Sequence, residues 1–243
     1  MKLSLFKPPI FDKINLLKYI YYKYFKREFI QGSFIFKRQK YDRRALISSV
    51  IFKKINAQGM ENVNYLEIGC DKDGTFNSIP LLKINKVGVD PISGGTERVT
   101  SDIFFQNNER YFDVIFIDGL HTYKQVKKDF ENSLKFLKKG GHIFIDDMLP
   151  YNWSMQHNPR IKGKWTGDVW KLAVEIYDSQ LFSFDLFESN YGIGVVQNTK
   201  NINQLPDKDY QNKSFSEYLH YRKNLFKITD IENFIRQNMG YSN

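Results

Sequence analysis

The stretch FDVIFIDGLHTYKQVKKD, residues 112–129, decides the fold class that we predict. Five of its first seven residues are apolar, as in a buried strand, and the chain then changes to apolar residues at helical spacing. The helix predicted over residues 123–138 carries that spacing at Val126, Phe130, Leu134 and Leu137. A buried strand that leads directly into a helix is half of a βαβ unit, and Asp118 and His121 stand at the junction.

The same alternation of short apolar runs and longer amphipathic runs extends from residue 63 to residue 197. Strands are predicted at residues 64–68, 86–89, 113–117, 142–145, 182–187 and 192–197, with a further short strand at 98–100. Parallel strands joined by helices form a doubly wound sheet, which binds its ligands at the carboxyl ends of the strands. We therefore predict an α/β fold with its functional residues at the strand ends.

We divide the chain into three parts. Residues 1–59 form a basic, aromatic segment that we predict to be helical, residues 60–198 form the α/β domain, and residues 199–243 form a polar extension with helices at 214–226 and 230–239. The chain has one cysteine, Cys70, which excludes an intrachain disulfide and favours a reducing, cytoplasmic location. Its apolar windows are interrupted by Lys or Arg before they reach the roughly 18 residues that span a bilayer, so we predict no transmembrane segment.

The positive charge lies almost entirely in the N-terminal segment. Residues 1–54 carry 14 Lys and Arg against 3 Asp and Glu, a net charge of +11, so the rest of the chain sums to −2 within the total of +9. A basic nucleic-acid-binding protein would be expected to carry cationic residues around its active cleft, whereas this chain keeps them away from its acidic motifs in sequence. We therefore expect no nucleic-acid partner. The interleaved aromatic and basic residues 13–44 fit either an amphipathic helix packed on the domain or a peripheral contact with the inner, anionic face of a membrane.

The first strand-to-helix turn, NYLEIGCDKDGTF at residues 64–76, has the features of a ligand loop. Thr75 and Phe76 stand where a phosphate-binding loop needs Lys and Ser or Thr, and Cys70-Asp71 breaks a dinucleotide fingerprint. The acidic loop instead suits a ligand with a cationic part. Asp90 ends the next predicted strand, where a carboxylate can accept both hydroxyls of a ribose.

Five motifs in this order carry a family resemblance: LEIGC, VGVDP, TSDIFF, FDVIFIDGLHTY and GGHIFIDDM. Over residues 60–197 the chain resembles the class I S-adenosylmethionine-dependent methyltransferases, and within them the metal-dependent sugar O-methyltransferases of the macrocin and mycinamicin type. The resemblance implies a Rossmann-like methyltransferase fold, with a seven-stranded, mostly parallel sheet and a final antiparallel strand.

The resemblance also implies a cofactor site for S-adenosylmethionine. Glu67, Gly69 and Gly74 would line its methionine and ribose end, and Asp90 would take the ribose hydroxyls. Ser101 and Asp102 would flank the adenine. Asp118 is also assigned to the cofactor site. The glycine loop is one residue longer than is usual in the family, which weakens the assignment of Gly74.

A metal site is predicted from Asp118, Asp146 and Asp147, which all stand at strand ends. Converging carboxylates repel one another unless a cation neutralises them, and oxygen ligands select Mg²⁺, or Mn²⁺, over softer metals. The same three residues match the metal positions of the resembling family. The alternative is that Asp146 caps the following turn while Asp118 and Asp147 face water. His121, three residues after Asp118, is the predicted general base.

Several further residues are left with two interpretations. The long connection at residues 149–164 is a candidate binding loop or lid, and Thr166 or Asp168 is expected to cap the helix that follows. Trp165 and Trp170 would either stack on a sugar ring or close the core, and His157 is a weaker candidate for substrate contact. His142 opens an apolar strand and is interpreted as structural.

The predicted function is therefore a metal-dependent O-methyltransferase that transfers a methyl group from S-adenosylmethionine to a sugar hydroxyl, in a glycan precursor or a glycosylated small molecule. The alternative within enzymes is a methyltransferase that acts on a phenol, an amine or a phosphoramidate. A nucleic-acid-binding protein on the same fold is the least favoured interpretation. We also expect a homo-oligomer.

Overall fold

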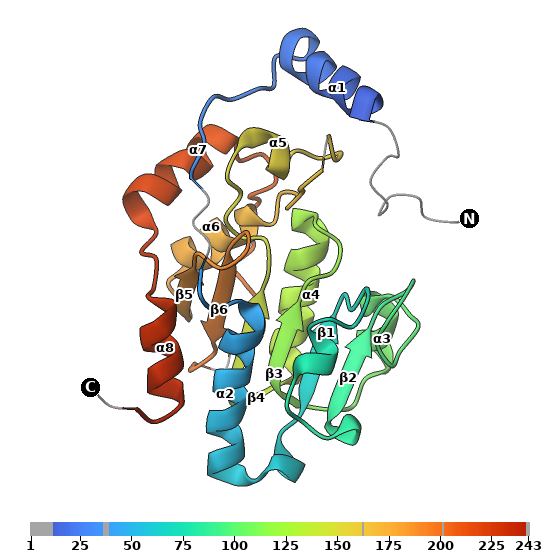
Figure 1. The fold of residues 1–243 in the computed structure, drawn as a ribbon, viewed down its shortest axis with the longest axis vertical. Helices are drawn as coiled ribbons and strands as arrows, with labels where there is room; N and C mark the ends of the chain where they lie inside the picture. Colours follow the sequence, from blue (N-terminus) through green and yellow to red (C-terminus); the bar gives the residue numbers. More distant parts are fainter. Residues whose placement is uncertain (1–11, 36–38, 162, 201, 242–243) are drawn as a thin grey trace.

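The computed structural model describes residues 12–35, 39–161, 163–200 and 202–241 (Figure 1). A six-stranded sheet has the order β2-β1-β3-β4-β6-β5. Its strands are β1 (Tyr65–Ile68), β2 (Lys86–Val89), β3 (Phe112–Ile117), β4 (Leu137–Ile145), β5 (Ser183–Phe187) and β6 (Ile193–Gln197). Parallel pairing joins β2, β1, β3 and β4, whereas β6 runs antiparallel to both β4 and β5. The predicted α/β sheet with a final antiparallel strand is confirmed.

The predicted seventh strand, at residues 98–100, was wrong. Glu97 forms only an isolated bridge to Val89, and the helix α3 (Ser101–Asn107) starts four residues later. Thr100 is the N-cap of α3, where its hydroxyl accepts a hydrogen bond from the Ile103 N–H at 3.3 Å. The chain between the bridge and the cap is too short to form another edge strand.

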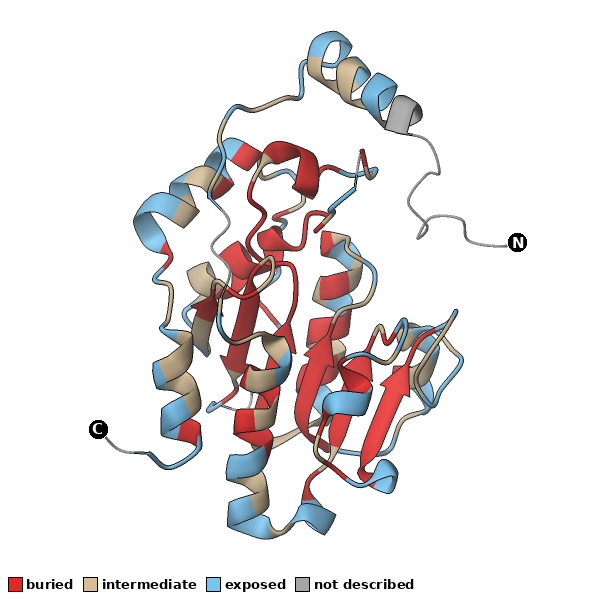
Figure 2. Cartoon of the chain, in the orientation of Figure 1, coloured by how far each residue is buried: buried red, intermediate tan, exposed pale blue. Residues whose placement is uncertain are grey.

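Two helical layers cover the sheet because successive strand residues face opposite sides. One layer holds α3, α4 (Tyr123–Phe136), α6 (Trp170–Ser179) and α7 (Phe215–His220), which pack on Leu66, Ile115 and Ile143. The other holds α2 (Arg43–Gln58) and α8 (Ile231–Asn238), which pack on Tyr65, Val114 and Phe144. Figure 2 shows the strands buried between the layers.

The remaining elements are short or lie outside the layers. They are α1 (Asp12–Ile20), α5 (Trp153–Gln156), two π-helical turns at Tyr21–Phe25 and Tyr221–Leu225, and 3₁₀ turns at Met60–Asn62, Phe76–Ser78 and Lys83–Asn85. Among the described residues, no helix is both long and apolar enough to cross a membrane. The division into 1–59, 60–198 and 199–243 stays a prediction, and α2 from the first part packs against α8 from the third.

Two local predictions were wrong where tertiary contacts replaced local ones. The helix predicted to reach residue 138 ends at Phe136, because Leu137 pairs with Phe112 and begins β4. Neither Thr166 nor Asp168 caps α6, whose N-cap is Val169. The Asp168 carboxylate instead accepts a hydrogen bond from the backbone N–H of Tyr123 at 2.8 Å, at the start of α4.

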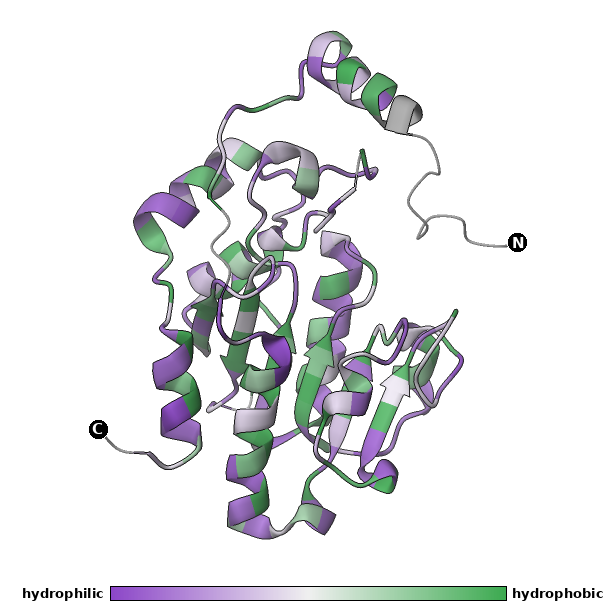
Figure 3. Cartoon of the chain, in the orientation of Figure 1, coloured by the Kyte–Doolittle hydropathy of each residue, from purple (hydrophilic) through white to green (hydrophobic). Residues whose placement is uncertain are grey.

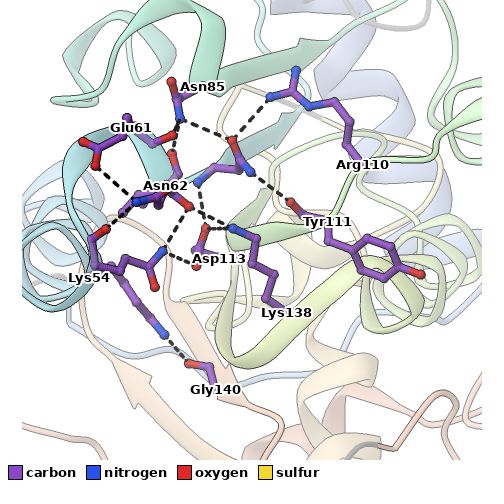
Figure 4. Close-up of polar contacts among 12 residues, drawn as sticks. Lys54, Glu61, Asn62, Asn85, Arg110, Tyr111, Asp113, Lys138 and Gly140 are labelled. Carbon is purple, nitrogen blue, oxygen red and sulfur yellow. Dashed lines mark hydrogen bonds and ion pairs between the residues drawn. The ribbon is translucent and has the colours of Figure 1, made fainter.

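A buried carboxylate fixes the end of the sheet that faces away from the predicted site (Figure 4). Asp113, with a side chain only 3% exposed, accepts hydrogen bonds from Lys138 Nζ at 2.7 Å, Gln58 Nε2 at 3.0 Å and the Asn64 N–H at 2.8 Å. The contacts join the end of α2 to the starts of β1, β3 and β4. They therefore fix the starts of these strands relative to one another, and the strands then run toward the opposite edge, where the predicted site residues lie.

We predict that Asp113→Ala lowers the free energy of unfolding by about 3 kcal/mol, because it leaves buried donors and a half-buried ammonium without their acceptor. Urea unfolding monitored by circular dichroism measures the change. Asp207→Ala, at an exposed aspartate, is the control and should shift stability very little. Equal stabilities for the two variants would contradict the role assigned to Asp113.

Candidate active site

The predicted acidic residues meet at the carboxyl ends of two neighbouring strands. Ile117 of β3 pairs with Ile145 of β4, so Asp118 and Asp146 leave the sheet side by side, and Asp147 follows. All three line a cavity of about 350 Å³. Its other lining residues come from α2, the loops and the turn before β6: Arg43, His121, Trp165, Asn190 and Tyr191.

Arg43 lines the cavity and is not among the site residues predicted from the sequence. Its guanidinium contacts the carboxylate of Asp118 at 2.9 Å and also that of Asp146, while Nε donates to Thr75 Oγ1 at 3.1 Å. Burial lowers the pKa of Arg43, but the two carboxylates outweigh it and raise that pKa above its usual value. The sequence does contain a signal for this position of Arg43. Arg43 has helical spacing to Leu46, Ile47 and Val50, which are buried, so it lies on the face of the helix that meets the protein.

His121 is held among carboxylates, as predicted from its place after Asp118. Its Nδ1 lies 2.8 Å from Asp147 Oδ2 and its Nε2 lies 3.5 Å from Asp118 Oδ1. Burial lowers the pKa of His121, yet the two aspartates reverse this and raise the pKa well above 6.5. The two aspartates therefore favour the protonated form of the imidazole.

The carboxylates after β4 sit in unfavourable surroundings. Burial raises the pKa of Asp146 well above 3.8, and the neighbouring Asp118 and Asp147 raise it further. Burial likewise raises the pKa of Asp147, against the effect of His121. Asp147 also has a left-handed backbone with φ of 64°, a strained conformation for a residue with a side chain. Such strain persists only where surrounding contacts hold it.

One compact group of possible metal ligands shares two residues with the predicted set, which stays a prediction. Asp118, His121 and Asp147 each provide one ligand atom, and these atoms all lie within 4.8 Å of one another. Arg43 contacts the carboxylates of both Asp146 and Asp118. Among the described residues, Arg43 and His121 are the cationic groups that contact these three carboxylates.

Gly69 and Gly74 follow β1 and differ in what they require. Gly69 has φ of 88°, and a Cβ there would lie 2.0 Å from the carbonyl oxygen of Asp118. Only glycine therefore allows the β1 turn to approach the end of β3 so closely. A Cβ on Gly74 would have no neighbour within 4 Å, so packing does not explain this glycine.

Glu67 and Asp90 are both buried at the ends of their strands. Tyr65 donates its hydroxyl to Glu67 Oε2 at 2.5 Å, and burial is the main effect that raises the pKa of Glu67 to about 8. Asp90 accepts hydrogen bonds from the N–H groups of Asp71, Ile92 and Ser93. A carboxylate has about four acceptor positions, so Asp90 retains capacity for a ligand hydroxyl.

Ser101 and Asp102 lie in the first turn of α3, outside the acidic cavity. Gln125 of α4 donates to both, at 3.3 Å to Ser101 Oγ and 3.2 Å to Asp102 Oδ1. Lys128 pairs with Asp102 at 2.7 Å. Of the predicted cofactor residues only Asp118 also lines the cavity, so the cofactor and cavity sets share one residue.

The two tryptophans lie in different surroundings, and so do His157 and His142. Trp165 stacks on His121 in the cavity wall, with ring centroids 5.2 Å apart, whereas Trp170 is fully buried in the core. His157 is not among the residues that line the cavity, and its Nε2 lies 2.8 Å from Glu28 Oε2. His142 is buried, which lowers its pKa to about 4, in agreement with a structural role.

Residues 79–148 match a family described as a methyltransferase domain. The uncharacterized protein R132 of Acanthamoeba polyphaga mimivirus is 30% identical, with 42% of this chain and 58% of that protein covered. The chain thus spans less than two thirds of the curated relative that it matches.

Two solved structures illustrate the structural likeness. MycE methyltransferase from the mycinamicin biosynthetic pathway, solved with Mg, SAH and mycinamicin VI, has a TM-score of 0.43 and 15% identity, with 65% of this chain and 50% of that chain covered. A putative caffeoyl-CoA O-methyltransferase from Staphylococcus aureus has a TM-score of 0.45 and 14% identity, with 77% and 93% covered. The family match and the strand order confirm that the chain resembles the class I methyltransferases.

Proposed function

We propose that this chain is an S-adenosylmethionine-dependent O-methyltransferase that requires a divalent cation and acts on a sugar hydroxyl, in a glycan precursor or a glycosylated small molecule. The observation that carries the proposal is the convergence of Asp118, His121 and Asp147 in one cavity at the carboxyl ends of β3 and β4. A doubly wound sheet places its ligands at this edge. The match of residues 79–148 to a methyltransferase domain supports the same activity.

The residues after β1 and β2 are the proposed cofactor site. Glu67, Gly69 and Gly74 would hold the methionine and ribose end of S-adenosylmethionine, and Asp90 would accept its ribose hydroxyls. Ser101 and Asp102 would lie against the adenine. The cofactor supplies the methyl group on a sulfonium, and the acids of this turn suit that positive charge.

Asp118, Asp146 and Asp147 are the proposed metal ligands. Their carboxylate oxygens suit Mg²⁺ and also accept Mn²⁺. A bound divalent cation would offset the carboxylates and lower the pKa of an acceptor hydroxyl. The protein supplies the ligands on two adjacent strand ends, which keeps their spacing rigid.

His121 is the proposed general base. A base must be neutral before it takes a proton, and Asp118 and Asp147 hold this imidazole in its charged form. His121 can therefore act as a base only when the negative charge of Asp118 and Asp147 is neutralised by another group. Stacking against Trp165 and contact between Nδ1 and Asp147 fix the ring, which leaves Nε2 as the nitrogen that would receive the proton.

A phenol is a second candidate for the acceptor. The cavity wall includes Trp165 and Tyr191, and a flat aromatic acceptor would stack on such rings as well as a sugar does. The two acceptors are distinguished by direct assay. Transfer of labelled methyl groups from S-adenosylmethionine to methyl glycosides, with catechol as the comparison, should favour the glycosides if the lead proposal is right.

Calorimetric titration of S-adenosylhomocysteine and of Mn²⁺ into the protein tests the two sites separately. We expect the wild type to bind both, and Asp147→Asn to lose the metal heat while it retains the cofactor heat. Asp207→Asn, at an exposed aspartate, should behave as the wild type does. Absence of cofactor binding in the wild type would overturn the proposed activity. Cofactor binding without a metal heat in the wild type would remove only the metal requirement.

Substitution of Gly69 and of Gly74 distinguishes a role in packing from a role in cofactor binding. Gly69→Ala should destabilise the fold by several kcal/mol, because its Cβ would overlap the Asp118 carbonyl. Gly74→Ala should melt as the wild type does but bind S-adenosylhomocysteine roughly tenfold more weakly, since a methyl group there would occupy ligand space. Thermal unfolding and calorimetry measure both effects. Gly163→Ala, also in open space, is the control, and equal affinities in the two open-space variants would remove Gly74 from the site.

Arg43→Met should lower the stability of the metal-free protein by about 3 kcal/mol, because two carboxylates lose their counter-ion. Added Mn²⁺ should raise the melting temperature of this variant more than that of the wild type. Differential scanning calorimetry with and without the metal measures both shifts. Arg44→Met is the control, because Arg44 is exposed and pairs only with Asp42 among the contacts described. If Mn²⁺ does not raise the melting temperature of Arg43→Met more than that of the wild type, Arg43 does not contribute to the metal site.

A further inference from the structure

The N-terminal helical segment carries an exposed apolar face outside the two layers of the fold. Residues 16–27, LLKYIYYKYFKR, continue from α1 through the π-helical turn Tyr21–Phe25. Figure 1 shows this segment standing off the body of the molecule, and Figure 3 shows hydrophobic stretches along it. The exposed apolar residues are Leu16 (58%), Leu17 (67%), Tyr21 (47%), Tyr24 (62%) and Phe25 (77%).

The opposite face of the segment is anchored to the body. Tyr22 packs on His157 with ring centroids 4.3 Å apart, and Tyr19 and Phe29 meet Trp153 edge to face at 6.4 and 5.4 Å. Glu28 pairs with His157 at 2.8 Å. These contacts determine which side of the segment faces the protein. The exposed residues therefore form a defined outer surface.

The charge of this surface is uniform. Residues 16–27 contain four cations, Lys18, Lys23, Lys26 and Arg27, and no acid. Lys23 Nζ lies 5.1 Å from the ring centroid of Tyr24, so one cation is held among the aromatic rings. Tyrosines and cations around leucines are typical of helices that lie in the interface of an anionic bilayer. Two copies of this surface would repel each other, which disfavours a symmetric contact between chains.

We propose that residues 16–27 form a docking surface for membranes that contain anionic lipids. Leu16, Leu17 and Phe25 would enter the boundary between head groups and acyl chains, and Lys18, Lys26 and Arg27 would meet the lipid phosphates. The opposite face of the segment contacts the rest of the protein through Tyr19, Tyr22 and Phe29. This docking is independent of the proposed reaction, because none of these residues lines the acidic cavity.

The test is co-sedimentation of the full chain with phosphatidylcholine vesicles and with vesicles that are roughly one third phosphatidylglycerol. The wild type should bind the anionic vesicles more tightly, and less tightly as salt rises. Leu17→Glu/Phe25→Glu should weaken this binding more than 100-fold, on the order expected for two lost apolar side chains. Ile84→Glu is the control, because Ile84 is 80% exposed on another part of the surface.

A second variant tests the charge separately from the apolar contact. Lys18→Gln/Lys26→Gln/Arg27→Gln should lower the affinity roughly 100-fold and flatten its salt dependence, since each of the three cations near the surface contributes about fivefold. Circular dichroism and thermal unfolding confirm that both variants are folded. The proposal is overturned if the wild type does not bind anionic vesicles, or if Ile84→Glu weakens binding as much. It is also overturned if Leu17→Glu/Phe25→Glu only converts a dimer to a monomer, which would make the surface an interface between chains.

Discussion

Compensation of three neighbouring carboxylates is the constraint on which the candidate site depends. The register of β3 and β4 places Asp118 and Asp146 at adjacent strand ends, and Asp147 follows on the same turn. Burial raises the pKa of both Asp146 and Asp147, so these acids need cationic partners to remain ionised. Arg43 and His121 supply that charge from two other segments of the chain.

This requirement links the site to the rest of the fold. Arg43 reaches the acids only because α2 buries its apolar face against the sheet, and the contact of Arg43 with Thr75 extends the link to the turn after β1. On the other side, a Cβ on Gly167 would lie 1.6 Å from the carbonyl oxygen of His121. That close approach brings Trp165 onto the imidazole ring. The cavity is thus closed by three segments that are distant in sequence.

The loop that closes the cavity also supports the N-terminal segment. Trp165 donates its indole N–H to the carbonyl of His157 at 2.9 Å, and the ring of His157 packs on Tyr22. Trp153 of α5 packs on Phe29 in the same region. A continuous set of contacts therefore joins the proposed docking surface to the wall of the acidic cavity.

The sequence by itself determined the α/β fold, six of the strands, and the strand-end positions of Asp118, Asp146, Asp147 and His121, because period and spacing are local properties. It predicted a seventh strand at 98–100 that a helix cap replaces. Only the tertiary structure identified the partners: Arg43 on the acids, Asp168 on α4, Trp165 in the cavity and Trp170 in the core. The physical reason is that each of these depends on which segments pack together, and a side chain's own neighbours in sequence do not encode the charge or surface that it will meet.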